Sequence, residues 1–340
     1  MSVREELQAT IEELAQKGRG ILAADESNPT MAKRLKAIDV ESTEEHRRSY
    51  RSMLLSTAGI GEFISGVIMF EETLGQKTDD GTALPELAAK QGVVPGIKVD
   101  KGKGPLPGAP GDEITFGLDG LEQRLEAYKG QGARFAKWRC VYNISDTCPS
   151  RLAIEANAEV LARYAAVCQE QGIVPIVEPE VLMDGDHSIE RCAEVTEVVQ
   201  HEVFHALHCH RVTLEHMLLK PNMVVSGKGH SHQAGPEEVA IRTLEVLRRT
   251  VPAAVPSINF LSGGQTPEEA TANLNAINQR PHRPWELSFS YGRALQETAL
   301  KAWKGDPANV SRAQRVFYER ARLNGAARSG EYSSSMEAAA

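Results

Sequence analysis

Ionisable side chains recur near the C-terminal ends of short apolar runs. Five runs carry them, in the order Asp25, Lys98 with Asp100, Lys137 with Arg139, Glu178 with Glu180, and Lys220. Side chains two positions apart on a strand point to the same face, so each pair would lie on one side of its strand. A single such charge usually faces solvent, but five runs that repeat the placement indicate a shared polar site. The four cations balance the four anions, as a buried polar site requires.

This set of lysines and carboxylates suits carbon–carbon bond cleavage through a Schiff base. A lysine beside other cations in a partly desolvated pocket has a lowered pKa, and its amine attacks a ketone to form an iminium. The iminium takes up the electrons of the bond that breaks, while a carboxylate carries the protons. Glu178 suits that work if its neighbour Glu180 or burial raises its pKa, and Asp25 is placed to orient the lysines and take a hydroxyl proton. Strand facing alone leaves three candidates for the nucleophile, Lys98, Lys137 and Lys220.

Two glycine-containing turns follow the last two predicted strands and suit a phosphate group. They are Ser262-Gly263-Gly264 and Ser290-Tyr291-Gly292-Arg293. Barrels commonly hold phosphate with backbone N–H groups of these loops, and Arg293 adds a forked cation, although a Ser-Gly-Gly turn is also a common plain connection. A second phosphate needs another polar patch, for which the candidates after the first strand are Ser27, Lys33, Arg34 and Arg47. A solvated helical face would carry similar residues. The strand-end cations Lys98 and Arg139 complete the predicted substrate-binding set.

The pattern that must position these residues is an apolar run, a turn and a helical segment, repeated about eight times. The predicted strands are residues 20–25, 64–70, 95–100, 135–142, 173–181, 217–224, 257–263 and 287–292. The predicted helices include residues 43–57, 121–131, 151–171, 188–210, 236–250 and 267–278. Such alternation implies a parallel sheet, and eight units that close on themselves make a TIM barrel with its site at the C-terminal strand ends. An open doubly wound sheet would usually carry a glycine fingerprint after its first strand, which Ala24-Asp25-Glu26-Ser27 lacks.

We therefore predict an α/β fold with a single TIM (β/α)8 barrel domain over residues 1–340. Its core would span about residues 18–304, preceded by an N-terminal helix whose apolar residues are spaced as a stripe. The C-terminal helices and a tail would occupy about residues 305–340.

Local signals predict several details of the connections. Asp186 or Ser188 is expected to cap the long helix that follows, and Thr266 begins the helix before the eighth strand. Residues 101–111 are expected to form a long glycine- and proline-rich loop. The tail after about residue 326 is expected to be weakly ordered.

The bulk properties indicate an intracellular globular protein. Of the 340 residues, 41% are hydrophobic and 25% charged, and the formal charge of −8 argues against a nucleic-acid-binding protein. The N-terminal segment lacks the character of a signal or transit peptide, and no stretch approaches the roughly 18 apolar residues of a membrane span. The five dispersed cysteines indicate reduced thiols rather than disulfides or a zinc ribbon. The expected location is therefore the cytoplasm.

The segment from His201 to His205 satisfies the HExxH pattern of zinc metalloproteases. Two histidines four residues apart share a helical face and have the spacing of a zinc pair. The extended pattern needs a glycine and a third histidine at the positions that here hold His208 and Arg211. The motif also lies on a helix away from the strand-end charges, so we expect a polar outer helix there and no metal site.

Seven stretches resemble class I fructose-1,6-bisphosphate aldolases. They are GILAADES (20–27), GIKVDKG (96–102), FAKWRCVY (135–142), VPIVEPEVL (174–182), LLKPNMV (218–224), FLSGGQ (260–265) and FSYGRAL (289–295). They occur in the family's order over nearly the whole chain, up to about residue 325. The resemblance implies a TIM barrel, usually a homotetramer, that reversibly cleaves fructose 1,6-bisphosphate to dihydroxyacetone phosphate and glyceraldehyde 3-phosphate in glycolysis and gluconeogenesis. It implies a lyase without metal or cofactor, whose partners are small sugar phosphates and neither nucleic acid nor membrane.

The resemblance also implies roles for individual residues. The family's Schiff-base lysine corresponds to Lys220 in LLKPNM, and its general acid/base to Glu178, the first glutamate of VEPE. Further residues that line the family's site correspond to Asp25, Lys98 and Lys137. The phosphate binders correspond to Ser262-Gly263 and Arg293. A binding protein without activity on this scaffold is disfavoured by the intact lysine and glutamate, and a related Schiff-base aldolase for another ketose phosphate is the nearer alternative.

Two features depart from the family pattern. After the first strand the family often reads ESTGS, whereas this chain has Glu26-Ser27-Asn28-Pro29-Thr30, in which the proline removes a backbone donor. Animal members end in a tail whose terminal tyrosine assists proton exchange on the enamine, whereas this chain ends Met336-Glu337-Ala338-Ala339-Ala340. Tyr332 is the only tyrosine nearby and is not expected to replace it. We therefore predict slower proton exchange or a different proton carrier.

Overall fold

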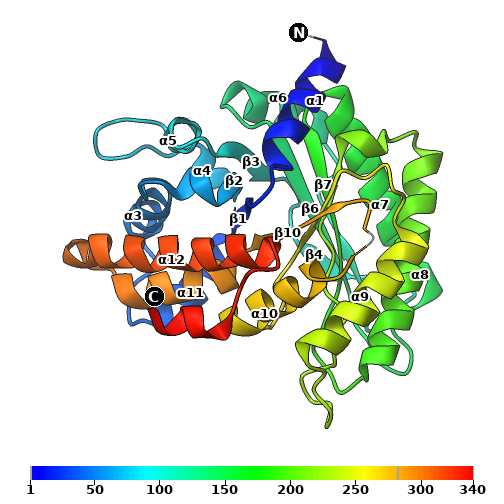
Figure 1. Cartoon of the computed structure of the whole chain (residues 1–340). Coiled ribbons are helices and arrows are strands. Elements are labelled where there is room, and N and C mark those ends of the chain that lie inside the picture. The colour runs from blue at the N-terminus through cyan, green and yellow to red at the C-terminus, as the bar shows by residue number, and fades with distance from the viewer. Residues whose placement is uncertain (1, 282, 340) are drawn as a thin grey trace.

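The eight parallel strands of the chain close into a single barrel (Figure 1). The computed structural model describes residues 2–281 and 283–339. In barrel order the strands are β1 (Gly20–Ala24), β10 (Glu286–Tyr291), β9 (Ser257–Phe260), β8 (Leu218–Leu219), β7 (Val174–Val181), β6 (Phe135–Tyr142), β3 (Val94–Lys98) and β2 (Ile64–Met69). Every adjacent pair is parallel. The predicted TIM (β/α)8 barrel is confirmed.

Helices surround this barrel on its outer side, as Figure 1 shows. Their bounds are α1 (Val3–Leu14), α2 (Asn28–Lys36), α3 (Glu44–Leu55), α4 (Glu71–Leu74), α5 (Leu84–Lys90), α6 (Leu121–Gly130), α7 (Arg151–Glu170), α8 (Ile189–Cys209), α9 (Pro236–Thr250), α10 (Pro267–Asn278), α11 (Arg293–Trp303) and α12 (Val310–Arg328). The six helices whose bounds were predicted lie within two residues of their expected ends, whereas α2, α4, α5 and α11 were not predicted. Within the part of the chain that is described, no helix is long and apolar enough to cross a membrane.

Capping residues explain why the predicted helix starts were accurate. Ser188 begins α8 by accepting a hydrogen bond from the backbone N–H of Arg191, so Ser188 rather than Asp186 is the cap. At α10, Thr266 and Glu269 form a reciprocal capping box. Both signals act within one helical turn, so they can be recognised without the tertiary structure.

Helix α1 closes the N-terminal end of the barrel with apolar side chains. Its buried residues Leu7, Ile11 and Leu14 pack in one cluster with residues of the barrel interior. That cluster includes Val94, Phe135, Val174 and Leu218, the first residues of β3, β6, β7 and β8. Because this end is filled by apolar packing, a polar pocket must open at the C-terminal strand ends.

The sixth barrel strand is shorter than the predicted strand of residues 217–224. Regular pairing is confined to Leu218–Leu219, because Pro221 has no N–H to continue the ladder. Single backbone hydrogen bonds still hold the following residues, from Lys220 N–H to Val177 O (2.8 Å) and from Leu261 N–H to Pro221 O (3.0 Å). Lys220 therefore lies at the exact point where β8 opens toward the C-terminal face.

The segment predicted as a long loop, residues 101–111, contains part of a β-hairpin. Strand β4 (Lys103–Pro105) pairs antiparallel with β5 (Glu113–Thr115). The loop prediction was wrong for these residues because the pairing partner lies outside the segment from which the loop was inferred. The hairpin follows β3 directly and therefore lies at the C-terminal face of the barrel.

The prediction of a weakly ordered tail is wrong for the described residues beyond 326. Helix α12 continues to Arg328, and Tyr332 is buried, with its N–H donating to Asn275 Oδ1 (2.9 Å). The Tyr332 hydroxyl donates to Glu337 Oε1 (2.8 Å), which also accepts from Arg320 of α12 (2.9 Å). Composition alone missed this order because the partners belong to α10 and α12.

Candidate active site

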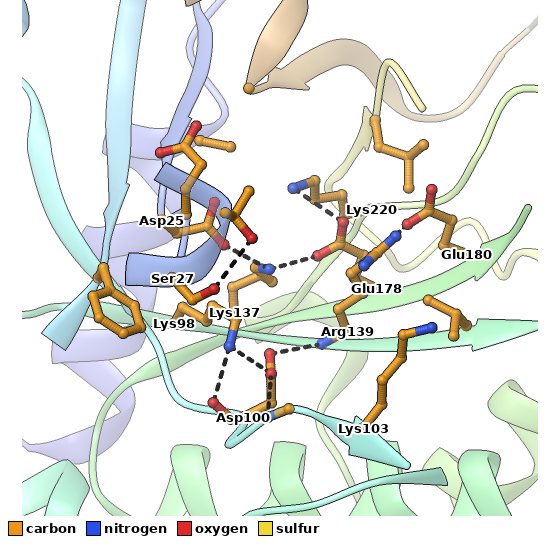
Figure 2. Close-up of a pocket in the computed structure, with 18 of the residues that line it drawn as sticks. Asp25, Ser27, Lys98, Asp100, Lys103, Lys137, Arg139, Glu178, Glu180 and Lys220 are labelled. Atoms are coloured by element: carbon orange, nitrogen blue, oxygen red, sulfur yellow. Dashed lines mark hydrogen bonds and ion pairs between the residues drawn. The ribbon is translucent and has the colours of Figure 1, made fainter. Parts of the chain in front are cut away.

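The eight strand-end charges all line one cavity at the C-terminal face of the barrel (Figure 2). The cavity has a volume of about 620 Å³. Its charged lining includes the predicted set, Asp25, Lys98, Asp100, Lys137, Arg139, Glu178, Glu180 and Lys220. Closure of the barrel brings β1 opposite β7 and places β3, β6, β7 and β8 in succession along the wall, so residues far apart in the sequence share this space.

A chain of ion pairs crosses the centre of the cavity, as Figure 2 shows. Lys137 Nζ lies 2.7 Å from Asp25 Oδ2 and 3.1 Å from Glu178 Oε2. Glu178 Oε1 in turn lies 3.1 Å from Lys220 Nζ. The side chains of Lys137, Glu178 and Lys220 are 4–5% exposed. Glu178 thus bridges two buried lysines that come from different strands.

Electrostatics distinguish the two central lysines. Burial by itself would lower the pKa of Lys137, but Asp25 and Glu178 hold that pKa well above its ordinary value. Lys137 is therefore an ammonium ion at neutral pH, and an ammonium ion is not a nucleophile. Burial would likewise raise the pKa of Asp25, but Lys137 and Lys220 hold it well below its ordinary range. The Asp25–Lys137 pair is thus a fixed pair of charges in the cavity wall.

This low pKa predicts a specific acid sensitivity. Because folding depresses the pKa of Asp25, its ionisation stabilises the fold above the ordinary value of 3.8, and this stabilisation is lost as the pH falls below it. We expect the Tm of the unchanged protein to fall more between about pH 4 and pH 2 than that of an Asp25→Asn variant, by roughly several degrees. Differential scanning fluorimetry across this range measures the difference. The exposed Asp119→Asn change is the control, and parallel pH profiles for the unchanged protein and Asp25→Asn would contradict the prediction.

Two further charge pairs lie at the rim of the cavity. Lys98 Nζ donates to Asp100 Oδ1 (2.6 Å), and Arg139 Nε donates to Glu180 in a close ion pair. Side chains two positions apart along a strand point to the same face, which is why all four residues face the cavity. Figure 2 shows the two pairs below and beside the central chain of ion pairs.

The two predicted phosphate turns lie at the same cavity. Its lining includes Ser262, Gly263, Ser290, Gly292 and Arg293, but not Gly264. The Ser290 hydroxyl is buried without a hydrogen-bond partner among the described residues, so it is available to a ligand oxygen. A Cβ atom at Gly263 would lie 2.9 Å from Glu180 Oε1, which explains why this turn carries glycine next to the carboxylate.

The candidates that follow β1 separate into two groups. Ser27 and Arg34 line the cavity, and Arg34 forms a close ion pair with Glu26. Lys33 is not among the lining residues. Arg47 is not among them either, since its guanidinium pairs with Glu72 (2.5 Å).

The proline in this loop does not interrupt a hydrogen-bond ladder. Pro29 lies in the first turn of α2, after the N-cap Ser27. N–H groups in the first turn of a helix have no partner within the helix, so proline is tolerated there. The departure of this loop from the family pattern is therefore compatible with a regular helix start.

Sequence reasoning missed several residues of the cavity lining. They include Glu26, Phe70, Glu71, Lys101, Lys103 and Thr115. Lys101 and Lys103 carried a usable signal, because they directly follow the third strand and loops after barrel strands lie at the active face. The HExxH histidines His201 and His205 are exposed on α8, and among the described residues no group of three or more metal-ligating side chains is present.

Comparisons with known proteins find similar sequences and a similar structure over nearly the whole chain. A sequence model for the family "Fructose-bisphosphate aldolase class-I" matches residues 6–340. The chain is 54% identical over 329 residues to "Probable fructose-bisphosphate aldolase class 1" of Xanthomonas campestris pv. campestris, covering 96% of this chain and 98% of that protein. It is 56% identical over 331 residues to "Fructose-bisphosphate aldolase, non-muscle type" of Lethenteron camtschaticum, covering 97% and 91%. A solved Plasmodium falciparum fructose-bisphosphate aldolase, in complex with TRAP and a small molecule inhibitor, has a TM-score of 0.96 and 50% identity, covering 97% and 96% of the two chains.

Proposed function

Because the chain belongs to the class I fructose-bisphosphate aldolase family and is thus a lyase, we propose that it cleaves fructose 1,6-bisphosphate reversibly through a Schiff base on Lys220. The products are dihydroxyacetone phosphate and glyceraldehyde 3-phosphate. The observation that carries the proposal is the contact of the buried Lys220 with Glu178, which also contacts Lys137. These contacts bring together the amine of Lys220, the carboxylate of Glu178 as proton carrier and the fixed cation of Lys137.

Among the three candidate lysines, Lys220 is the best placed nucleophile. Lys137 is held as an ammonium ion between two carboxylates. Lys98 donates to both the carboxylate and the carbonyl of Asp100, at 2.6 Å and 3.0 Å. Lys220 contacts one carboxylate oxygen only, among the ion pairs of the described residues. Transfer of one proton from Lys220 to Glu178 frees the amine to attack the ketone and leaves Glu178 with a proton for the next step.

Glu178 is suited to carry the protons of the reaction. It protonates the carbinolamine hydroxyl so that water leaves and the iminium forms, and as a carboxylate it then takes the proton of the C4 hydroxyl. The C3–C4 electron pair moves into the iminium to give the enamine, and the aldehyde leaves. Asp25 orients Lys137 across the cavity, since a carboxylate whose pKa is held low is a weak base. Glu180 holds Arg139 beside the phosphate turn.

Two sets of lining residues suit the two phosphate groups. The first set belongs to the turns after β9 and β10 and comprises Ser262, Gly263, the Ser290 hydroxyl, Gly292 and Arg293. The second set comprises Ser27 and Arg34, which follow β1, and Lys98 at the end of β3. The C1 phosphate is assigned to the first set and the C6 phosphate to the second. Lys33, Arg47 and Gly264 lie outside the lining and are assigned at most a supporting role.

Borohydride trapping tests the central step. Reduction in the presence of dihydroxyacetone phosphate is expected to inactivate the enzyme irreversibly and to add the mass of the reduced triose phosphate to the peptide that holds Lys220. Peptide mass mapping locates the adduct, and reduction without the triose is the control. An adduct on another lysine, no adduct, or loss of activity in EDTA would each contradict the proposal. Cleavage rates for several ketose phosphates then test the preference for the bisphosphate.

The tail is expected to take no part in proton exchange. Tyr332 is outside the cavity lining, and its hydroxyl is engaged by Glu337, while burial followed by this hydrogen bond raises its pKa to about 12. We expect Tyr332→Phe to leave the rate of detritiation of dihydroxyacetone phosphate within about twofold of the unchanged enzyme, relative to the cleavage rate. Removal of residues 327–340 is a second variant. A selective loss of exchange in either variant would assign the tail a catalytic part.

Family membership also supports three proposals about the pathway and location of the enzyme, its cofactor requirement and its assembly. It is proposed to act in glycolysis and gluconeogenesis in the cytoplasm, where its five free thiols would stay reduced. It is proposed to need no metal or cofactor, and to assemble as a homotetramer. Light scattering of the purified protein is expected to give the mass of four chains.

A further inference from the structure

We propose that Asp100 is a positioning residue, which directs the Lys98 ammonium toward the C6 phosphate and holds the backbone of β6 at Arg139. The proposal rests on the function proposed above. The sequence analysis counted Asp100 among the strand-end charges of the site, on one strand face with Lys98, but gave it no role of its own.

Asp100 engages two of the three donors of the Lys98 ammonium. Lys98 Nζ donates to Asp100 Oδ1 (2.6 Å) and to the Asp100 backbone O (3.0 Å). An ammonium group has three N–H bonds, so only one remains for another acceptor. The Lys98 side chain is 16% exposed and that of Asp100 is 5% exposed, and both residues line the cavity. A single donor aimed from a fixed position suits one phosphate oxygen better than a freely rotating ammonium group.

The other carboxylate oxygen extends the barrel ladder beyond β3. The last backbone bond of this ladder runs from Val99 N–H to Lys137 O (3.0 Å). In a regular parallel ladder the next bond would reach the Val99 carbonyl, but that carbonyl accepts from Arg124 Nη1 (2.8 Å) instead. The backbone N–H of Arg139 points to Asp100 Oδ2 at 3.4 Å. The side chain of Asp100 thus takes the place of a backbone acceptor.

Asp100 also sets the start of the hairpin that borders the cavity. Its Oδ1 atom accepts from the backbone N–H of Gly102 (3.3 Å), where the chain turns with a positive φ of 90° toward β4. Figure 2 shows Asp100 between Lys98 and Arg139, with interactions to both. Because its oxygens face protein donors on three sides, Asp100 acts on a ligand through its neighbours.

The test is a double-mutant cycle on Asp100 and Lys98. Asp100→Ala is expected to raise the KM for fructose 1,6-bisphosphate roughly 10- to 100-fold with a smaller change in kcat, because a charged hydrogen bond is lost. Fructose 1-phosphate, which has no C6 phosphate, should show a much smaller change in KM. In a Lys98→Ala background, Asp100→Ala should add less than about a twofold further effect, because the shared partner is already absent.

A second variant and a matched control keep the result interpretable. Asp100→Asn retains an acceptor for Lys98 without the charge and should have an intermediate effect, so it replaces the alanine variant if that one does not fold. Asp112→Asn is the control, since Asp112 is also buried and accepts from the Ser150 N–H (3.0 Å) but lies outside the cavity lining. It should leave KM within about twofold.

Different outcomes would contradict the positioning role of Asp100 and the proposed function. Effects of Asp100→Ala and Lys98→Ala that multiply, or an equal rise in KM for both substrates, would overturn the positioning role. Borohydride trapping on Lys220 should persist in every variant. If the unchanged enzyme forms no adduct, the proposed function fails rather than the role of Asp100.

Discussion

Replacing Lys220 by methionine is expected to abolish both cleavage and borohydride trapping. We expect kcat to fall by roughly 10⁴-fold or more, because the amine supplies the covalent electron sink and no other group of the site can replace it. Methionine has a side chain of similar length and fills the buried space, so the fold should persist. A coupled assay of triose phosphate formation measures the rate, and intact mass after reduction measures the adduct.

Two other lysines provide the controls for this change. Lys129 pairs with Glu6 on the surface, away from the cavity, and Lys129→Met should retain full activity and full trapping. Lys137→Met should still form the adduct on Lys220, although it removes the cation between Asp25 and Glu178 and should lower the Tm, because two buried carboxylates lose a partner. An adduct that persists in Lys220→Met and disappears in Lys137→Met would reassign the nucleophile.

Replacing Glu178 by glutamine is expected to lower kcat by roughly 10²- to 10⁴-fold, which is the usual contribution of a positioned general acid or base. The amide oxygen can still accept a hydrogen bond from Lys220 at the present separation of 3.1 Å, so the geometry should be kept while proton transfer is lost. Carbinolamine dehydration and C4 hydroxyl deprotonation should both slow. We therefore expect the adduct to form on Lys220, but more slowly than in the unchanged enzyme.

Glu180→Gln is the matched control, because Glu180 lies two residues further along the same face of β7 and pairs with Arg139. Its loss should affect KM more than kcat, since Arg139 would lose its fixed orientation beside the phosphate turn. Rapid-quench measurements of trapped adduct separate the two variants. Equal losses of kcat in both would indicate that Glu178 acts only as a charge and not as a proton carrier.

Much of the fold was predictable because its signals are local. The capping boxes and caps at α8 and α10 act within one turn, and the alternation of strands and helices reflects burial on the inner and outer faces of the barrel. The predictions failed where a partner lies elsewhere in the chain. Strand β4 requires β5, and the order of the tail requires Asn275 and Arg320. The residues of β4 and of the tail do not by themselves indicate that these partners exist.

The sequence by itself determined the kind of chemistry, because the period of two along a strand puts Lys137 with Arg139 and Glu178 with Glu180 on shared faces. Only the tertiary structure decided how those charges divide the work. Closure of the barrel places Asp25 of the β1 end 2.7 Å from Lys137 of β6, and Glu178 of β7 between Lys137 and Lys220. Lys137 therefore contacts two carboxylates, whereas Lys220 contacts one. These contacts join strands that are distant in the sequence, so the fixed charge pair of Asp25 and Lys137 could be recognised only in the closed barrel. The family resemblance, by contrast, had already singled out Lys220, the proposed nucleophile, among the three lysines.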